Sequence, residues 1–210
     1  MPGLVASIIY LIRHGETEWN LADRMQGALD SPLSDRGKAQ AAIIGDILRA
    51  ELARQQPFSV HCSPLGRARQ TADIICARLE HRFDACRIDE RLREATRGQW
   101  DGLTPDEIEK HTPGGLAARH RDKWNYVPPD GENYAMAGER AAAWLREFGG
   151  DGVAVVVCHG ITGKLLRGLY LGLTEAEITR LDQPQDAVYR LQGGSITRLE
   201  ADEAYEDMKT

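Results

Sequence analysis

Residues 7–17 read SIIYLIRHGET, an apolar, β-branched run that ends in a charged segment containing a glycine. Ser7 to Ile12 has the length and the isoleucine content of a buried strand. Gly15 permits a sharp turn immediately after it. The sequence therefore predicts a buried strand that delivers Arg13 and His14 into a loop at its carboxyl end.

Strand-like and helix-like segments alternate along most of the remaining chain. Helical spacing begins at Ser34, the expected N-cap, and continues to about residue 55; a strand-like run follows at 58–62. A second helix is expected to begin at Ser63-Pro64, with the serine as cap and the proline at the first helical position. The other expected elements are a strand at 84–88, a helix at 132–148, a strand at 153–158, a helix broken by Gly163 and Gly168 that runs to 171, and a hairpin at 186–199 centred on Gly193-Gly194. This alternation predicts an α/β fold, a three-layer sandwich with a largely parallel mixed sheet flanked by helices.

The length and composition are those of one domain. A chain of 210 residues with 42% hydrophobic content can bury one sizeable core, so we expect a single domain over residues 1–210. Residues 91–130 mix glycine, proline, tryptophan and charge without a clean period. We expect this segment to be an excursion that covers the active site as a lid.

The charge balance and the apolar runs limit the partners. A formal net charge of −6 argues against binding to nucleic acid or to an anionic membrane, since both need a basic excess. The longest apolar run, Val153 to Cys158, has only the length of a strand and no secretory signal precedes the first strand. These features predict a cytoplasmic protein, and they leave a homodimer open.

Polar residues follow three of the expected strands at the point where each strand ends. They are Arg13 and His14 after the first strand, Ser63 and Arg67 after the second, and His159 and Gly160 after the strand at 153–158. The carboxyl ends of parallel strands share one edge of a sheet, so these residues could share a pocket. Guanidinium groups bind phosphoryl oxygens bidentately and an imidazole can attack phosphorus. The pattern predicts a phosphoryl-transfer site that needs no metal and no cofactor.

Other interpretations of the histidines are weaker. A single histidine at a strand end is most often a structural residue, but two beside two arginines are less easily explained in that way. A zinc site could draw on His61 with Cys62, on His159 with Cys158, or on His111 with His120, yet no pair has the short spacing typical of structural zinc.

Two further segments carry misleading or weak signals. Residues 160–165, GITGKL, suggest a phosphate-binding loop, but the glycines are too close together and no Ser or Thr follows the lysine. Arg119, Arg121 and Lys123 could contact a substrate carboxylate or a second phosphate. A charge run of this kind is usually a solvated face, and that is the expectation for these three residues.

Several motifs in fixed order resemble those of the histidine phosphatase superfamily, also called the phosphoglycerate mutase-like family. They are Arg13-His14-Gly15-Glu16-Thr17, Trp19-Asn20, Gln26-Gly27, Pro32-Leu33-Ser34, Gly37, Gln40, Ser63-Pro64-Leu65-Gly66-Arg67-Ala68, Thr71-Ala72, Leu92-Arg93-Glu94, Gly98-Gln99-Trp100-Asp101-Gly102, Gly131-Glu132 and Cys158-His159-Gly160. The resemblance covers the chain from about residue 8 to 171 and implies a phosphoglycerate mutase-like fold.

The resemblance also implies roles for individual residues. His14 is expected to be the phosphorylated nucleophile and Glu94 the proton donor, a role that periodicity alone does not reveal. The expected phosphate-binding residues are Arg13, Asn20, Arg67, His159 and Gly160. Arg97 departs from the family, which usually carries an aromatic residue there, so the identity of the substrate is the property least predictable from the resemblance.

The expected activity is that of a phosphomonoester hydrolase which acts on small phosphorylated metabolites through a phosphohistidine. The segment Trp100-Asp101-Gly102 looks more like the phosphatase members than the glycolytic mutases. The alternative is mutase-type transfer between substrate hydroxyls. A non-catalytic module that binds phosphorylated ligands is a third interpretation, and retention of both His14 and Glu94 argues against it.

Overall fold

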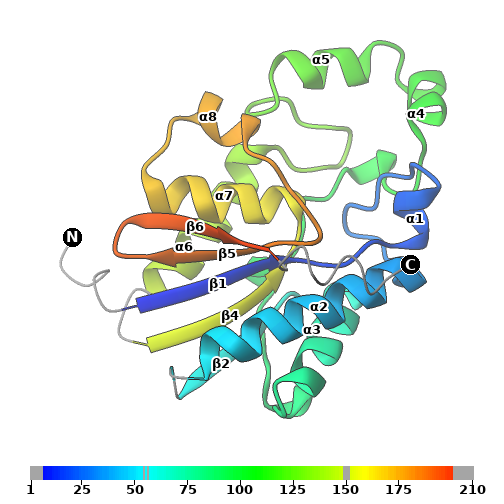
Figure 1. Ribbon diagram of the computed structural model, residues 1–210. Helices are drawn as coiled ribbons and strands as arrows, with labels where there is room; N and C mark the ends of the chain where they lie inside the picture. The colour runs from blue at the N-terminus through cyan, green and yellow to red at the C-terminus, as the bar shows by residue number, and fades with distance from the viewer. Residues whose placement is uncertain (1–6, 54, 56, 149–151, 201–210) are drawn as a thin grey trace.

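A six-stranded sheet forms the centre of the computed structural model, which describes residues 7–53, 55, 57–148 and 152–200 (Figure 1). The strands are β1 (Ser7–Arg13), β2 (Phe58–Cys62), β3 (Arg87–Ile88), β4 (Gly152–Cys158), β5 (Val188–Gln192) and β6 (Ser195–Leu199). Their order is β3-β2-β4-β1-β5-β6. Strands β3, β2, β4 and β1 are parallel to one another, whereas β5 is antiparallel to β1 and β6 is antiparallel to β5. The predicted mixed, largely parallel sheet is confirmed.

Two pairs of helices cover the two faces of the sheet, which confirms the three layers (Figure 1). Helices α2 (Asp35–Leu52) and α3 (Gly66–Arg78) pack on one face, and α6 (Tyr134–Phe148) and α7 (Gly160–Leu171) on the other. Successive residues of a strand point to opposite faces, so β1 contributes to both cores. Its residues Tyr10 and Ile12 pack towards α2 and α3, whereas Ile9 and Leu11 pack towards α6 and α7.

Most predicted boundaries hold within a few residues, and the differences have local causes. Helix α2 begins after Ser34, whose hydroxyl accepts the N–H of Gly37 at 3.0 Å. Helix α3 begins at Gly66 and not at Ser63-Pro64, because the Ser63 hydroxyl accepts the N–H of Leu65 and also bonds His159. The strand expected at 84–88 shrinks to β3, since Phe83–Ala85 forms a 3₁₀ turn.

In the second half of the chain one prediction was wrong, one helix was not predicted and one predicted turn is confirmed. Gly163 and Gly168 do not break α7. A Cβ on Gly168 would lie 2.2 Å from Ile178, so this glycine instead lets α8 (Glu175–Arg180), which the sequence did not reveal, pack closely on α7. Gly193 and Gly194 join β5 to β6 with φ of 57° and 77°, as a tight hairpin turn requires.

Residues 91–130 contain two short helices, α4 (Pro105–His111) and α5 (Gly115–Arg121), and two 3₁₀ turns, Glu90–Leu92 and Gly98–Trp100. In Figure 1 this segment and α1 (Glu18–Leu21) lie beyond the carboxyl end of β1. Trp100 is fully buried, donates its indole N–H to Thr112 at 3.1 Å and stacks on Tyr126. No helix among the described residues is long and apolar enough to cross a membrane.

The turn after β1 packs directly against the first turn of α2 through two glycines. A Cβ on Gly15 would lie 2.3 Å from the Gly37 carbonyl oxygen, and one on Gly37 would lie 1.9 Å from the Glu16 carbonyl oxygen. The Gln40 side chain accepts the Glu16 N–H at 2.9 Å, and the Ser34 N–H donates to the Glu16 carbonyl. This close backbone contact fixes the loop that carries His14 and gives a physical reason for Gly15, Gly37 and Gln40.

The contact predicts opposite effects for alanine at two helical glycines. Gly37→Ala should lower the free energy of unfolding by about 3 kcal/mol, because the new methyl group meets rigid backbone. Gly138→Ala in α6 is the control: its Cβ would make only an ordinary 3.5 Å contact with Leu165, so it should be neutral or stabilise by about 0.5–1 kcal/mol. Urea denaturation of both variants measures the difference. Equal stability of the two variants would show that the loop can move away from α2.

Candidate active site

The register of the parallel strands brings the polar residues together at one edge of the sheet. Arg13 pairs with Cys158 across β1 and β4, and Cys62 pairs with Val157 across β2 and β4. The pairing continues past the strands, since the His14 N–H donates to the Cys158 carbonyl at 3.0 Å and the Ser63 N–H donates to the Val157 carbonyl at 3.0 Å. The residues that follow the three strands therefore lie side by side.

His14 is almost completely buried, with 3% of its surface exposed. Its Nδ1 lies 2.8 Å from the Gly15 carbonyl oxygen and its Nε2 accepts a hydrogen bond from Nε of Arg67 at 3.2 Å. A carbonyl oxygen can only accept, so Nδ1 carries the proton and Nε2 presents its lone pair. Burial, followed by the charges of Arg67 and Arg13, lowers the pKa of His14 well below 6.5. The imidazole is thus neutral at neutral pH, as a nucleophile must be.

Arg67 is held rigidly although it is buried. Its Nη1 donates to the Leu29 carbonyl at 2.6 Å and to the Asp30 carboxylate at 2.9 Å, and its Nη2 donates to the Gly27 carbonyl at 2.8 Å. Only 1% of the Arg67 side chain is exposed, so the cost of burying the charge is offset by Asp30 and by these carbonyls. The fixed guanidinium directs its Nε at His14.

His159 lies against His14 in the interior, with ring centroids 5.2 Å apart. Its Nε2 is 2.7 Å from the Ser63 hydroxyl, and its Nδ1 is buried without a partner among the described residues. If the hydroxyl donates to Nε2, then Nδ1 carries a proton and has nothing to donate to. Burial, followed by the nearby charges of Arg67 and Arg13, lowers the pKa of His159 well below 6.5. A buried donor without a partner is unusual and is satisfied when an acceptor enters the site.

Arg13 and Asn20 present further donors. Arg13 donates from Nη1 to the Gln183 carbonyl at 2.5 Å, whereas its buried Nε has no partner among the described residues. The Asn20 side-chain oxygen accepts the Thr17 N–H and the Gln185 amide, each at 3.1 Å. Because Oδ1 of Asn20 is occupied in this way, its NH₂ group remains as the donor for a ligand.

Glu94 lies on the amino terminus of α7. One carboxylate oxygen accepts the Ile161 N–H at 3.0 Å, and the other accepts the N–H of Thr162 at 3.2 Å and that of Ala95 at 3.0 Å. The first N–H groups of a helix have no intrahelical partners and the helix dipole is positive there, so a carboxylate is favourable at this position. The carboxylate is thereby held beside Gly160, close to the other site residues.

Most of these groups line a cavity of about 160 Å³. Its walls are Arg13, His14, Asn20, Arg24, Met25, Gln26, Gly27, Arg67, Glu94, Arg97, Gly160, Ile161 and Gln183. His159 lies behind this lining, in contact with the His14 ring. A Cβ on Gly160 would lie 2.3 Å from the amide oxygen of the exposed Gln183 side chain, which would have to move away. The residues expected at the site are therefore close neighbours.

Asp101 connects the 91–130 segment to the cavity wall, a structural role that the sequence did not reveal. Its carboxylate accepts the Ala28 N–H at 3.0 Å, the Arg97 N–H at 2.7 Å and the Thr96 hydroxyl at 2.8 Å. Gly27, with φ of 50°, approaches so closely that a Cβ would lie 1.7 Å from this carboxylate. Thus Asp101 positions the loop around Gly27 and Arg97, two residues that line the cavity.

The basic run at 119–123 differs from the expected solvated face. Arg121 is exposed and Lys123 is half-buried, but Arg119 is 7% exposed and bonds the side chain of Tyr134 on α6. Burial and the nearby charge of Arg97 lower the pKa of Arg119 to about 10. The helical turn of α5 points one residue of the run inward, which the charge pattern alone does not reveal.

Of the histidines considered for zinc, only His159 lies at this site. His61 is buried between Trp144 and Phe148 and bonds the Ser59 hydroxyl, while His111 and His120 are exposed on α4 and α5. Residues 160–165 form the first turns of α7 and not a separate loop.

Comparison with known proteins gives a consistent result. The model of the histidine phosphatase superfamily (branch 1) matches residues 9–198. A glucosyl-3-phosphoglycerate phosphatase from Mycolicibacterium vanbaalenii is 34% identical over 175 residues, which are 79% of this chain and 74% of that protein. The mycobacterial glucosyl-3-phosphoglycerate phosphatase solved in complex with VO₃ superimposes with a TM-score of 0.74, at 31% identity over 94% of this chain and 98% of that one. A 6-phosphofructo-2-kinase/fructose-2,6-bisphosphatase from Aquarana catesbeiana is 33% identical over 87% of this chain, which spans only 37% of that larger protein.

Proposed function

The chain belongs to the histidine phosphatase superfamily and is a phosphatase of that type, and we propose that it hydrolyses small phosphorylated metabolites through a phosphohistidine on His14. The observation that carries this proposal is the state of the His14 ring. Its Nδ1 is bonded to the Gly15 carbonyl and its Nε2 lone pair is directed towards Arg67 at the cavity wall. A neutral imidazole held in one orientation can attack phosphorus without first losing a proton.

The surrounding donors suit the charge that develops during phosphoryl transfer. Arg13 and Arg67 bring two guanidinium groups to the cavity, and Asn20 adds an amide. In this proposal the unpartnered Nδ1 of His159 donates to a phosphoryl oxygen. Preorganised donors of this kind typically contribute about 10²–10³-fold each to turnover. No metal ion is required to neutralise the phosphoryl oxygens.

The reaction divides into two steps that share one carboxyl group. In the first, the His14 nitrogen bonds to phosphorus, the ester P–O bond breaks, and Glu94 gives its proton to the leaving oxygen. In the second, water attacks the phosphohistidine, the P–N bond breaks, and Glu94 takes a proton from the water. Water is the proposed acceptor rather than a second substrate hydroxyl, because the relatives are named as phosphatases.

His14→Ala should fold normally and lose nearly all turnover, since it removes the attacking atom. Rapid quenching of the wild-type protein on ³²P-labelled substrate should trap an acid-labile phosphoenzyme that the variant does not form. Analysis of the products from a phosphoglycerate tests the acceptor, with inorganic phosphate expected and an isomeric phosphoglycerate indicating a mutase. Near-normal turnover by His14→Ala would end the proposal, and tight binding without turnover by the wild type would favour a binding module.

Glu94→Gln should separate the two steps of the reaction. A general acid matters most for a basic leaving group, so an alkyl phosphate should react slowly in the first step. With p-nitrophenyl phosphate the first step should largely survive while attack by water is slowed, giving a burst of nitrophenol followed by slow turnover. The measurement is stopped-flow absorbance in comparison with chemical quench. Equal slowing of the first step for both substrates, without a burst, would assign the proton transfer to another group.

The cavity wall also favours a substrate with a second negatively charged group. Arg97 lines the cavity, and Arg119 lies buried nearby. Both guanidinium groups act on Tyr134: their charges lower its pKa, although burial raises it by more. Neither Arg97 nor Arg119 forms an ion pair with a carboxylate of the described residues. Arg119 is buried and Arg97 is half-buried. A cation removed from water without a counter-ion is costly, and an anion at this position offsets that cost. We infer that a carboxylate or a second phosphate of the substrate occupies this position, and both kinds of group occur in the substrates for which the relatives are named.

Arg119→Met should raise the KM for a phosphoglycerate by about 10–100-fold, because it removes a charged contact and keeps the bulk of the side chain. The KM and kcat for p-nitrophenyl phosphate, which has no second charged group, should change little. Arg121→Met on the exposed side of the same helix is the matched control and should leave both substrates unaffected. Steady-state kinetics with the two substrates measures the effect. A parallel loss with both substrates would show that Arg119 has only a structural role.

A further inference from the structure

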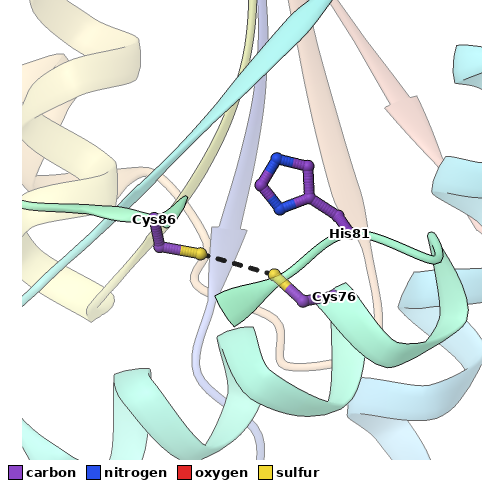
Figure 2. Close-up of side chains that lie close together, drawn as sticks. All are labelled: Cys76, His81 and Cys86. Atoms are coloured by element: carbon purple, nitrogen blue, oxygen red, sulfur yellow. Dashed lines mark hydrogen bonds between the residues drawn. The ribbon is translucent and has the colours of Figure 1, made fainter. Parts of the chain in front are cut away.

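Three potential metal ligands converge at the end of α3 that lies away from the cavity. Cys76 comes from the last turn of α3, His81 from the turn that follows, and Cys86 from the residue before β3 (Figure 2). The two sulfurs are 3.4 Å apart, and all three ligand atoms lie within 4.8 Å of one another. Among the described residues, no other group of three histidine, cysteine or acidic side chains meets this criterion.

We propose that Cys76, His81 and Cys86 bind one thiophilic cation of the Zn²⁺ class. The Nδ1 atom of His81 is buried and has no hydrogen-bond partner among the described residues. Figure 2 shows that this side of the ring faces the two sulfurs. A buried imidazole nitrogen usually has a hydrogen-bond partner. Where such a nitrogen instead faces two thiols, the three groups have the arrangement of zinc ligands without the ion.

The distances fit tetrahedral coordination after small side-chain movements. Zinc bonds of about 2.3 Å to sulfur and about 2.0 Å to nitrogen place two sulfurs about 3.8 Å apart and sulfur and nitrogen about 3.5 Å apart. The observed separation of the Cys76 and Cys86 sulfurs, 3.4 Å, is slightly shorter, and the separations between His81 and the two sulfurs are no longer than 4.8 Å. Three protein ligands leave a fourth position for water or another small ligand.

A nearby negative charge favours a cation at this position. The Cys76 and Cys86 sulfurs are already within hydrogen-bonding distance, at 3.4 Å, so both are directed at one point. The negative charge of Asp73, one turn before Cys76 on α3, acts on both thiols. Binding releases the two thiol protons and forms two metal–sulfur bonds, so no oxidant or reductant is needed.

The position of the site indicates a structural role. Cys76 lies about 14 Å along α3 from Arg67, which is in the first turn of the same helix. The ion would therefore not contact a phosphoryl group in the cavity. It would connect the end of α3 to the segment that leads into β3, and His81 also packs on Phe58 of β2 at a centroid distance of 5.4 Å. Binding should stabilise this edge of the sheet.

Metal binding by the reduced full-length protein tests the proposal directly. Titration with Zn²⁺ against a chromophoric chelator should give one tightly bound ion per chain and release of protons. Substitution with Co²⁺ should give the thiolate charge-transfer band and the intense visible bands of a tetrahedral site. X-ray absorption at the zinc edge should give two sulfurs and at least one imidazole nitrogen. Absence of stoichiometric binding, or a first shell without two sulfurs, overturns the proposal.

Variants assign the ligands. His81→Asn and Cys86→Ser change half-buried residues, and each should weaken Zn²⁺ binding by more than about 100-fold, since loss of a direct ligand costs more than loss of a supporting residue. Cys62→Ala is the matched control, because it removes a neighbouring buried thiol outside the group, and it should bind as the wild type does. Circular dichroism verifies that the variants fold. Unchanged affinity in both ligand variants contradicts the proposal.

Stability and turnover then distinguish this site from the phosphatase chemistry. Zn²⁺ at about 100 times its Kd should raise the Tm of the wild type by roughly 5–10 °C and that of Cys86→Ser very little. Removal of the ion with a chelator should lower the Tm and leave hydrolysis of p-nitrophenyl phosphate unchanged. An equal rise in Tm for both proteins would mean that the ion binds elsewhere. The result does not depend on whether His14 is the nucleophile.

Discussion

Parallel pairing of β4 with β1 and β2 is the constraint from which the site follows. Each strand must bury both faces, so its register is fixed by the two apolar cores, and a shift of one residue would turn every core side chain to the wrong face. The register that satisfies the cores places Arg13 beside Cys158, and His14 and His159 therefore emerge together at the same edge. The hydrophobic cores thus determine the position of two polar side chains that do not belong to them.

Once the histidines are buried, the electrostatics of the cavity follow from desolvation and charge. Burial and the positive charges around His14 keep its ring neutral, and the cost of burying Arg67 is offset by Asp30 and two backbone carbonyls. Glu94 satisfies the amino terminus of α7 with the carboxylate that is proposed to move protons. Two nitrogens of the site, Nδ1 of His159 and Nε of Arg13, nonetheless have no partner in the part of the chain that the structure describes. A protein interior with an excess of donors is suited to an anion that brings its own acceptors.

Helix α3 connects the two sites that are proposed. Its first turn presents Arg67 to the cavity, and its last turn contributes Cys76 to the group that includes His81 and Cys86. A rigid helix keeps these two ends separate, so an ion at one end could stabilise the scaffold without entering the chemistry at the other. Residues 91–130 contribute in a different way, because Asp101 and the buried Trp100 fix the segment while Arg97 and Arg119 set its charge near the cavity.

The sequence by itself determined the layer architecture and the edge of the sheet at which the polar residues gather. Apolar, β-branched runs and helical spacing are local properties, and Ser34, Gly193 and Gly194 act on their immediate neighbours, so these features could be predicted from short segments. The family motif added Glu94, whose contact with α7 joins residues more than sixty positions apart. Only the tertiary structure decided that Arg119 is buried while Arg121 is exposed, and that Cys76, His81 and Cys86 converge. Both depend on which side of a short helix or turn faces the rest of the protein, and that orientation is set by packing against distant elements rather than by the local order of residues.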